Sequence, residues 1–255
     1  MEYFFGAGTN IGPKKSTNQD SYLVKIAHYK DKDIAMAILC DGMGGLDRGE
    51  LASAFIVNEF SEWFDKEITK ILDDRDIIEN IAKQWKRKLE ELNYRLMEYG
   101  KRNSVTLGST ITGIIIINGR FLIVNVGDSR TYMINSIINQ ITEDQSLVAR
   151  EVRMGRMSSI EAELDPRRSV LLQCLGAVKN IDVEFYMGQA IPEDEFLLCS
   201  DGFRHKISNE EILDKLHPSK MKDESCIDNA IDELINLNLN RLETDNITAI
   251  LIKAV

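Results

Sequence analysis

Four short acidic segments of this chain could bring carboxylates together at one site. They lie at residues 18–20, 41–45, 200–202 and 244–246 and contain Asp20, Asp41, Asp201 and Asp245. Apolar runs lead into or out of three of these segments, which places their carboxylates at strand ends, where a sheet holds them in position. Carboxylates gathered there repel one another unless a cation neutralises them. The pattern therefore predicts a site for a hard metal ion, assembled from distant parts of the chain.

Each segment also has a simpler explanation when it is taken alone. The Asp-Gly-Met-Gly-Gly loop at 41–45 allows restricted backbone conformations and close approach of a ligand, but it could be a strand-to-helix turn with an incidental acid. Asp-Gly at 201–202 and Asp-Asn at 245–246 are common turn pairs. Asp20 suits a capping or turn role, and Asp128, between two expected strands, could be only a turn former. The joint order of the segments is what favours a shared site.

Hydrophobic periodicity predicts the elements that must position these residues. Residues 50–66 and 76–100 have apolar side chains at helical spacing. Asn118-Gly119 is a strong hairpin signal between strands 110–117 and 120–126, and a second hairpin is expected between 130–134 and 137–142. We expect these four strands to form one antiparallel meander. The other expected strands are 3–8, 21–26, 34–40, 170–174, 183–187, 196–199 and 247–253, and the other expected helices are 143–154, 158–164, 208–216 and 224–239.

The helix at 208–216 has a clear start, with Ser208 as N-cap and Glu211 completing a capping box. Strands in two groups, each followed by helices, indicate an α+β fold rather than a βαβ alternation. We expect one domain over residues 1–255, with two packed antiparallel sheets and helices outside. The last strand should join a sheet that begins near the N-terminus.

Composition excludes several classes of protein. The 255 residues are 44% hydrophobic and 28% charged, which is typical of a folded chain. A net charge of -10, with no basic run longer than Lys-Arg-Lys at 86–88, argues against binding nucleic acid or anionic membranes. The N-terminus does not resemble a secretory signal, and no apolar stretch approaches the roughly 18 residues of a membrane span. The four cysteines are widely spaced, which disfavours a zinc site or disulfide framework and suits the cytoplasm.

In its motifs the chain resembles the metal-dependent protein serine/threonine phosphatases of the PPM type, the protein phosphatase 2C-like family, in its short bacterial form. The resemblance covers nearly the whole chain. It rests on Asn18-Gln19-Asp20, Asp41-Gly42-Met43-Gly44-Gly45 followed by Gly49-Glu50-Leu51-Ala52-Ser53, Gly108-Ser109-Thr110, Val126-Gly127-Asp128-Ser129-Arg130, Thr142-Glu143-Asp144-Gln145-Ser146, Leu198-Cys199-Ser200-Asp201-Gly202 and Asp245-Asn246-Ile247-Thr248.

That resemblance implies a four-layer α-β-β-α sandwich and a site for two Mn²⁺ or Mg²⁺ ions. By the family pattern, Asp41 bridges both ions, Asp201 and Asp245 bind one, and the Gly42 carbonyl binds the other. Asp20 would act largely through bound water, and Asp128 matches the position used for a weaker third ion. All-oxygen ligation suits these hard cations rather than zinc.

The implied reaction is hydrolysis of phosphoserine and phosphothreonine in proteins. Two ions held close together lower the pKa of a bridging water, and the resulting hydroxide attacks phosphorus in line, without a phosphoenzyme. The implied partners are phosphorylated proteins and a serine/threonine kinase that shares these substrates. We expect a monomer.

Two residues, Lys15 and Met43, differ from family patterns that concern substrate binding and catalysis. Lys15 stands where a phosphate-binding arginine is usual, and lysine lacks the bidentate fork. It either holds phosphate, with Lys14 able to share the role, or is a solvated surface residue. Met43 replaces the histidine that many eukaryotic relatives have as proposed general acid, so a metal-bound water would have to protonate the leaving alkoxide. His205 is expected to be a surface or helix-entry residue rather than a catalyst.

Residues 144–179 correspond to the family's variable flap. A basic flap could attract phosphopeptides electrostatically, or its basic side chains could form a solvated helix face. The arginines concerned are Arg150, Arg153, Arg156, Arg167 and Arg168. An alternative function is a catalytically weak, phosphoprotein-binding regulatory member of the family. Lys15 and Asp165-Pro166, where relatives often have His-Pro, favour it, whereas the retained metal-site aspartates argue against it.

Overall fold

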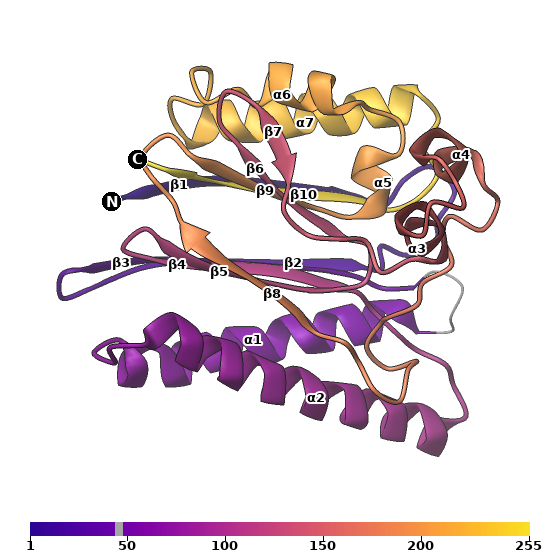
Figure 1. Cartoon of the computed structure of the whole chain (residues 1–255), viewed down its shortest axis with the longest axis horizontal. Helices are drawn as coiled ribbons and strands as arrows, with labels where there is room; N and C mark the ends of the chain where they lie inside the picture. Colours follow the sequence, from indigo (N-terminus) through magenta and orange to yellow (C-terminus); the bar gives the residue numbers. More distant parts are fainter. Residues whose placement is uncertain (44–47) are drawn as a thin grey trace.

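Two five-stranded antiparallel sheets pack face to face between two layers of helices (Figure 1) in the computed structural model, which describes residues 1–43 and 48–255. The first sheet has the order β1-β10-β9-β6-β7, with bounds Tyr3–Asn10, Ile247–Ala254, Glu195–Cys199, Arg130–Ile134 and Ile138–Gln140. The second has the order β2-β3-β4-β5-β8, with bounds Asp20–Tyr29, Lys32–Asp41, Ile111–Ile117, Arg120–Val126 and Glu184–Gln189. The expected α+β sandwich with α-β-β-α layers is confirmed.

The central strands are buried on both faces. Every residue of β4 and of β10 is buried, and most of these residues are apolar, so the two strands show no alternation of buried and exposed positions. The inner faces of the two sheets meet in one apolar layer, where the rings of Phe121 and Phe196 pack edge to face with centroids 5.1 Å apart. This close-packed layer fixes the position of the two sheets, and therefore of their strand ends, relative to each other.

Helices cover the outer face of each sheet. Helices α1 (Gly49–Ile71) and α2 (Ile77–Asn103) lie on the second sheet, and Trp85 of α2 packs its ring 5.3 Å from that of Phe60 and 5.5 Å from that of Trp63. Helices α6 (Asn209–Lys215) and α7 (Glu224–Asn240) lie on the first sheet (Figure 1). The predicted capping box of Ser208 and Glu211 is present at the start of α6.

The first and last strands of the chain are neighbours. Strands β1 and β10 pair antiparallel from Tyr3 opposite Ala254 to Asn10 opposite Ile247. This confirms the expectation that the last strand joins a sheet begun near the N-terminus. The interpretation as one domain stays a prediction that this pairing supports.

The expected four-strand meander is wrong. The hairpin of β4 and β5 belongs to the second sheet, whereas the hairpin of β6 and β7 belongs to the first. The chain changes sheet at residues 127–129, where Gly127 has a φ of 112° and a Cβ would lie 2.6 Å from Thr110 Cγ2. Strand β5 pairs with β8 instead of β6. Residues 127–129 lack the two-residue turn signal that 118–119 has, so no local pattern specifies that β5 and β6 pair.

Two further element predictions need correction. The expected strand at 170–174 is irregular and makes only isolated bridges, from Leu171 to Ser146 and, just beyond, from Leu175 to Ser109. The expected helix at 143–154 is the shorter α3 (Leu147–Arg153), because the Ser146 side chain caps it by accepting from the Ala149 N–H.

The helix expected at 158–164 is α4 (Ser159–Leu164), with a capping box from Ser158. Among the described residues, none of the helices is long and apolar enough to cross a membrane.

Candidate active site

The four predicted aspartates lie at strand ends on one edge of the sandwich. Asp20 begins β2 and Asp41 ends β3, and the two are direct partners in the antiparallel ladder of the second sheet. Asp201 is the first residue of α5 (Asp201–Arg204), and only Ser200 separates it from the end of β9. Asp245 lies just before β10. Strands β9 and β10 are neighbours in the first sheet, so their acidic ends face the same edge as Asp20 and Asp41 (Figure 1).

The backbone around Gln19 joins the two halves of this edge. Its carbonyl accepts from the Gly42 N–H at 3.0 Å, and its N–H donates to Asn246 Oδ1 at 2.9 Å. The Asn246 amide nitrogen donates to the carbonyl of Ile11 at 2.8 Å. The segments that contain Asp41 and Asp245, from different sheets, are therefore connected through a single residue.

Two glycines allow backbone segments to approach closely at this edge. A Cβ on Gly42 would lie 2.4 Å from the Gly49 carbonyl oxygen, and one on Gly202 would lie 2.1 Å from the Asn246 carbonyl oxygen. The second contact sets Asp201 next to the Asp245 segment. The other glycines of the predicted loop, Gly44 and Gly45, lie outside the described residues.

Burial and mutual repulsion make the ionised carboxylates unfavourable without a cation. Burial, then the charges of Asp20, Asp201 and other nearby aspartates, raises the pKa of Asp41 well above its ordinary value. Burial raises the pKa of Asp20 to about 7, and Asp201 and Asp245 add to the effect. Both carboxylate oxygens of Asp20 are buried without a hydrogen-bond partner among the described residues. A hard cation suits such oxygen donors and would remove both penalties.

The side chains do not yet form a complete ligand set. Within residues 1–43 and 48–255, no three acidic, histidine or cysteine side chains converge closely enough to hold a metal ion. The backbone brings the predicted ligands to one edge, and their side chains would have to turn toward an ion to bind it.

Lys15 points into this acidic edge. Its Nζ lies 2.6 Å from Asp245 Oδ1, and its side chain is 29% exposed. Partial burial lowers the pKa of Lys15, but the neighbouring carboxylates, Asp245 first, outweigh burial and raise it. Lys15 is therefore not a freely solvated surface lysine, whereas Lys14 is exposed.

Sequence reasoning missed Glu243, which supports the turn before Asp245. Its Oε1 accepts from the N–H groups of Thr244 and Asp245 at 2.7 and 2.9 Å. Its Oε2 lies 3.5 Å from His205 Nδ1, and His205 Nε2 lies 3.4 Å from Asp201 Oδ2. His205 is thus a largely buried residue at the C-terminal end of α5, and not the expected surface or helix-entry residue. The sequence did hold a signal for the contact between His205 and Asp201, because residues four apart on a helix are neighbours.

Asp128 lies where the chain passes between the sheets. Burial raises its pKa to about 7, with Asp201 contributing and Arg204 opposing. The Asp128 carbonyl accepts from Arg204 Nη2 at 3.0 Å. Sequence reasoning also missed Arg204, because nothing local relates it to a residue 76 positions earlier.

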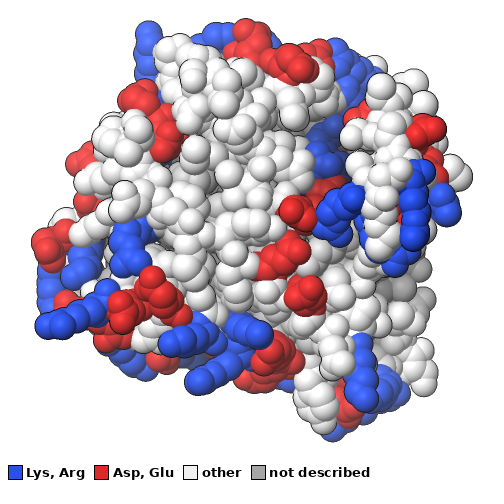
Figure 2. Space-filling view, in the orientation of Figure 1, with Lys and Arg blue, Asp and Glu red and all other residues white. Residues whose placement is uncertain are grey.

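The basic character of the flap is largely neutralised. Four of its five arginines pair with carboxylates of the flap or of the residue just before it: Arg150 and Arg156 with Glu151, Arg153 with Glu143, and Arg167 with Asp165. Figure 2 shows basic and acidic side chains intermixed on this face of the molecule rather than one continuous basic area. These pairings favour a solvated, internally paired flap surface.

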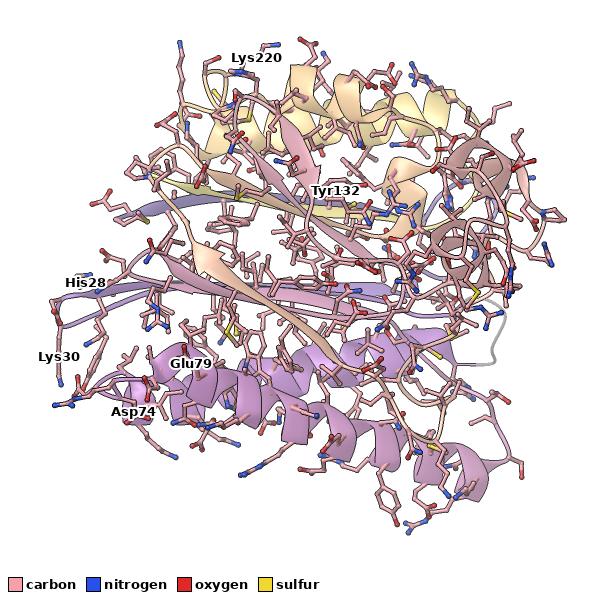
Figure 3. The ribbon with its side chains drawn as sticks, in the orientation of Figure 1. His28, Lys30, Asp74, Glu79, Tyr132 and Lys220 are labelled. Atoms are coloured by element: carbon pink, nitrogen blue, oxygen red, sulfur yellow. The ribbon has the colours of Figure 1, made fainter. Side chains whose placement is uncertain are left out.

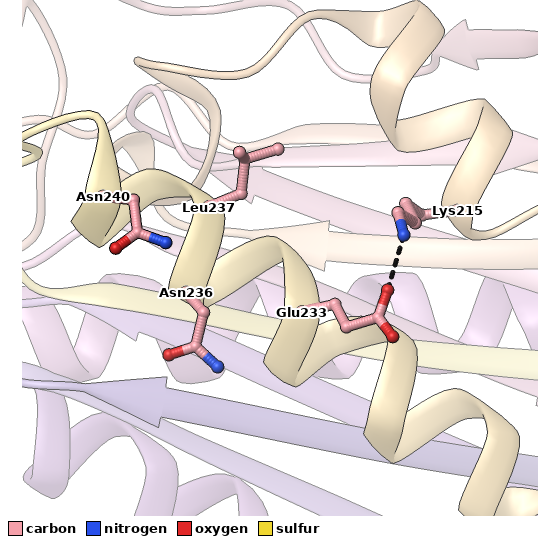
Figure 4. Close-up of a pocket in the computed structure, with 5 residues that line it drawn as sticks. All are labelled: Lys215, Glu233, Asn236, Leu237 and Asn240. Carbon is pink, nitrogen blue, oxygen red and sulfur yellow. Dashed lines mark hydrogen bonds and ion pairs between the residues drawn. The ribbon is translucent and has the colours of Figure 1, made fainter.

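Other polar groups lie away from the acidic edge. His28 pairs with Asp33 near the other end of the β2–β3 hairpin, where His28 and Lys30 are labelled in Figure 3. A cavity of about 290 Å³ lies between α6 and α7 and contains none of the candidate aspartates (Figure 4). Its lining residues are Lys215, Glu233, Asn236, Leu237 and Asn240, and Lys215 and Glu233 form an ion pair within it.

Comparisons with known proteins agree with the fold. A family profile of protein phosphatase 2C matches residues 7–241, so the chain belongs to the protein phosphatase 2C family. The serine/threonine phosphatase stp of Listeria welshimeri serovar 6b is 32% identical over 96% of this chain and 93% of its own length. The crystal structure of the serine/threonine phosphatase Stp1 from Staphylococcus aureus superposes with a TM-score of 0.84 at 29% identity, covering 98% of this chain and 94% of that chain.

A structure of the catalytic domain of the serine/threonine protein phosphatase PstP in complex with two manganese ions also superposes. Its TM-score is 0.78 at 25% identity, covering 98% of this chain and 97% of that chain. The chain described here is accordingly a bacterial-type protein serine/threonine phosphatase.

Proposed function

We propose that this chain hydrolyses phosphoserine and phosphothreonine in proteins and that two Mn²⁺ or Mg²⁺ ions at the acidic edge are required. The observation that carries the proposal is the pair Asp20, which is buried, and Asp41, its direct partner in the β2–β3 ladder. Gln19 joins their segment to the Asp245 segment of the other sheet. The manganese complex of PstP supports two ions as the number.

The proposed ligands follow the family pattern. Asp41 would contact both ions, Asp201 and Asp245 one of them, and the Gly42 carbonyl the other, while Asp20 would act through water. When bound, such ions lower the pKa of a water molecule and offset the charge of phosphoryl oxygens. Asp20 and Asp41 hold the negative charge that attracts the ions, and the glycine contacts at Gly42 and Gly202 keep the ligand segments together.

Lys15 is the proposed phosphate-binding residue. Its ammonium already lies at the acidic edge, on Asp245. A divalent ion bound by Asp245 would compete for the same carboxylate, which would free the ammonium for a phosphate oxygen. Lysine contacts phosphate as a point charge, so its orientation of the substrate is weaker than that of an arginine fork.

The proposed partners are phosphorylated proteins and the serine/threonine kinase that phosphorylates them. We also propose that the chain acts as a monomer in the cytoplasm. Its net charge of -10 and the intermixed charges in Figure 2 argue against a role in binding nucleic acid.

The test is hydrolysis of phosphoserine and phosphothreonine peptides by the purified chain, with Mn²⁺ and with excess EDTA. Turnover should require the metal, and Asp41→Asn should remain folded but lose nearly all Mn²⁺-dependent activity. Asp232→Asn, an exposed change of the same kind on α7, serves as the control and should retain activity. Turnover that survives EDTA or Asp41→Asn would reject the metal mechanism. Phosphopeptide binding without turnover would favour a regulatory binding module instead.

A further inference from the structure

Arg204 occupies a distinctive place beside the acidic edge. It ends the four-residue helix α5 that begins with Asp201, so one short helix supplies a proposed metal ligand and a largely buried cation. Its Nη2 donates to the Asp128 carbonyl at 3.0 Å and lies 3.9 Å from Asp128 Oδ2. The Arg204 side chain is 14% exposed, and that of Asp128 is 10% exposed.

A second arginine completes a balanced group of charges. Arg204 Nη2 also lies 3.4 Å from Asp144 Oδ2, and Arg130 holds Asp144 through two bonds of 2.8 Å, from Nε and Nη2. Arg130 Nη1 donates to the hydroxyl of Tyr132, which is labelled in Figure 3, at 2.9 Å. Two guanidinium groups thus face two carboxylates, and their formal charges cancel.

The remaining aspartates of the edge are not balanced in this way. Among the described residues, the other four aspartates form two ion pairs, Asp245 with Lys15 and Asp201 with His205. Asp20 and Asp41 form none among these residues. Arg204 therefore divides the acidic residues into an open group, which needs added cations, and the pair Asp128 and Asp144, which face the guanidinium groups of Arg204 and Arg130.

We propose that Arg204 is an internal cation that takes the place of a metal ion at Asp128. This rests on the proposed function, in which ions bind at the open group. A guanidinium stays protonated under all ordinary conditions, so Arg204 cannot give up its charge to admit a cation. Its burial and its bond to the Asp128 carbonyl keep it from swinging into solvent. A divalent ion at the Asp128 carboxylate would meet a fixed positive charge in a poorly screened environment. The third, weaker ion that the family pattern suggests is therefore replaced by a side chain.

The test is the number of Mn²⁺ ions bound per chain, from a titration of the full chain that follows the electron paramagnetic resonance signal of free Mn²⁺. The wild type and Asp128→Asn should bind the same number. Arg204→Met should bind one further ion, more weakly, and Arg204→Met with Asp128→Asn should lose that ion again. Arg204→Lys, which keeps the charge, should match the wild type.

Arg102→Met is the matched control for the change in net charge, because Arg102 is exposed on the last turn of α2. It should leave the number of bound ions unchanged. Loss of one ion in Asp128→Asn would overturn the proposal, and so would an unchanged number in folded Arg204→Met. If circular dichroism shows that Arg204→Met does not fold, the Asp128→Asn result decides alone. A wild type that binds no Mn²⁺ would contradict the proposed function, whereas a gain of an ion in Arg204→Met would still support the role of Arg204.

Discussion

Lys15 and Asp245 form an ion pair at the acidic edge, with Nζ 2.6 Å from Oδ1. The pair joins the loop before β2 to the turn before β10, and so links the two sheets at the place where the proposed ions bind. Lys15 therefore has two possible partners in turn: the carboxylate when the site lacks ions, and a substrate phosphate when ions neutralise the carboxylate.

This competition predicts opposite effects on metal and substrate. Lys15→Met should tighten Mn²⁺ binding by about 1.5- to 5-fold, the range expected for a partly exposed ion pair. The KM for a phosphopeptide should rise, because a positive charge near the phosphate is lost. Calorimetric titration with Mn²⁺ and steady-state kinetics measure the two effects. Lys14→Met is the control for net charge, and equal tightening in that variant would show that Lys15 has no specific role.

Asn246 should contribute to stability more than its size suggests. It accepts from the Gln19 N–H and donates to the carbonyls of Ile11 and Thr17, and it is buried. Asn246→Ala leaves these backbone groups unpaired and should lower the free energy of unfolding by about 1–3 kcal/mol. Urea unfolding gives the value. Asn236→Ala, at an exposed position of α7, should stay within about 0.5 kcal/mol of the wild type. Similar losses in the two variants would contradict the linking role of Asn246.

Gly202 should tolerate no side chain, because a Cβ would lie 2.1 Å from the Asn246 carbonyl oxygen. Backbone atoms cannot move aside as a flexible side chain can, so Gly202→Ala should separate Asp201 from the Asp245 segment. We expect Mn²⁺ affinity to fall by at least about tenfold, together with a loss of stability of about 1–3 kcal/mol from overpacking. Calorimetric titration and urea unfolding measure these effects. Wild-type Mn²⁺ affinity in Gly202→Ala would mean that this close contact does not position Asp201.

Glu195 should make stability fall as pH rises. It lies opposite Lys253 in the β9–β10 ladder, and both its carboxylate oxygens are buried without a hydrogen-bond partner among the described residues. Burial raises its pKa from 4.5 to about 8, with Lys253 opposing. The folded state thus retains a proton that the unfolded state releases above pH 4.5. The contribution to stability is complete below pH 4.5 and is lost as pH rises to about 8, by at most about 1.4 kcal/mol per pH unit.

Glu195→Gln removes this dependence, because the amide stays neutral in both states. Relative to the wild type, the variant should gain stability between pH 5 and pH 8, as measured by urea unfolding at both values. Glu163→Gln, an exposed change on α4, should shift stability equally at the two pH values. A constant difference between Glu195→Gln and the wild type would show that Glu195 is ionised in the folded chain throughout this range.

Much of the fold was predictable because local patterns specify local structure. Helical spacing of apolar residues located α1 and α2, and the Asn118-Gly119 turn located the β4–β5 hairpin. The same reasoning failed for β6, because pairing depends on which sheet offers an open strand edge, and neither periodicity nor turn residues report that. The Asp128 turn is where the prediction of a meander and the structure diverge.

The sequence by itself determined the kinds of residue at the acidic edge, their places at strand ends and the family that their order indicates. Only the tertiary structure decided how Lys15, Glu243 and Arg204 relate to those acids. Arg204 and Asp128 are 76 residues apart, and their contact exists because two sheets pack with α5 at the edge they share. Turn and strand preferences act over a few residues, whereas the balance of buried charges depends on distances that packing alone sets.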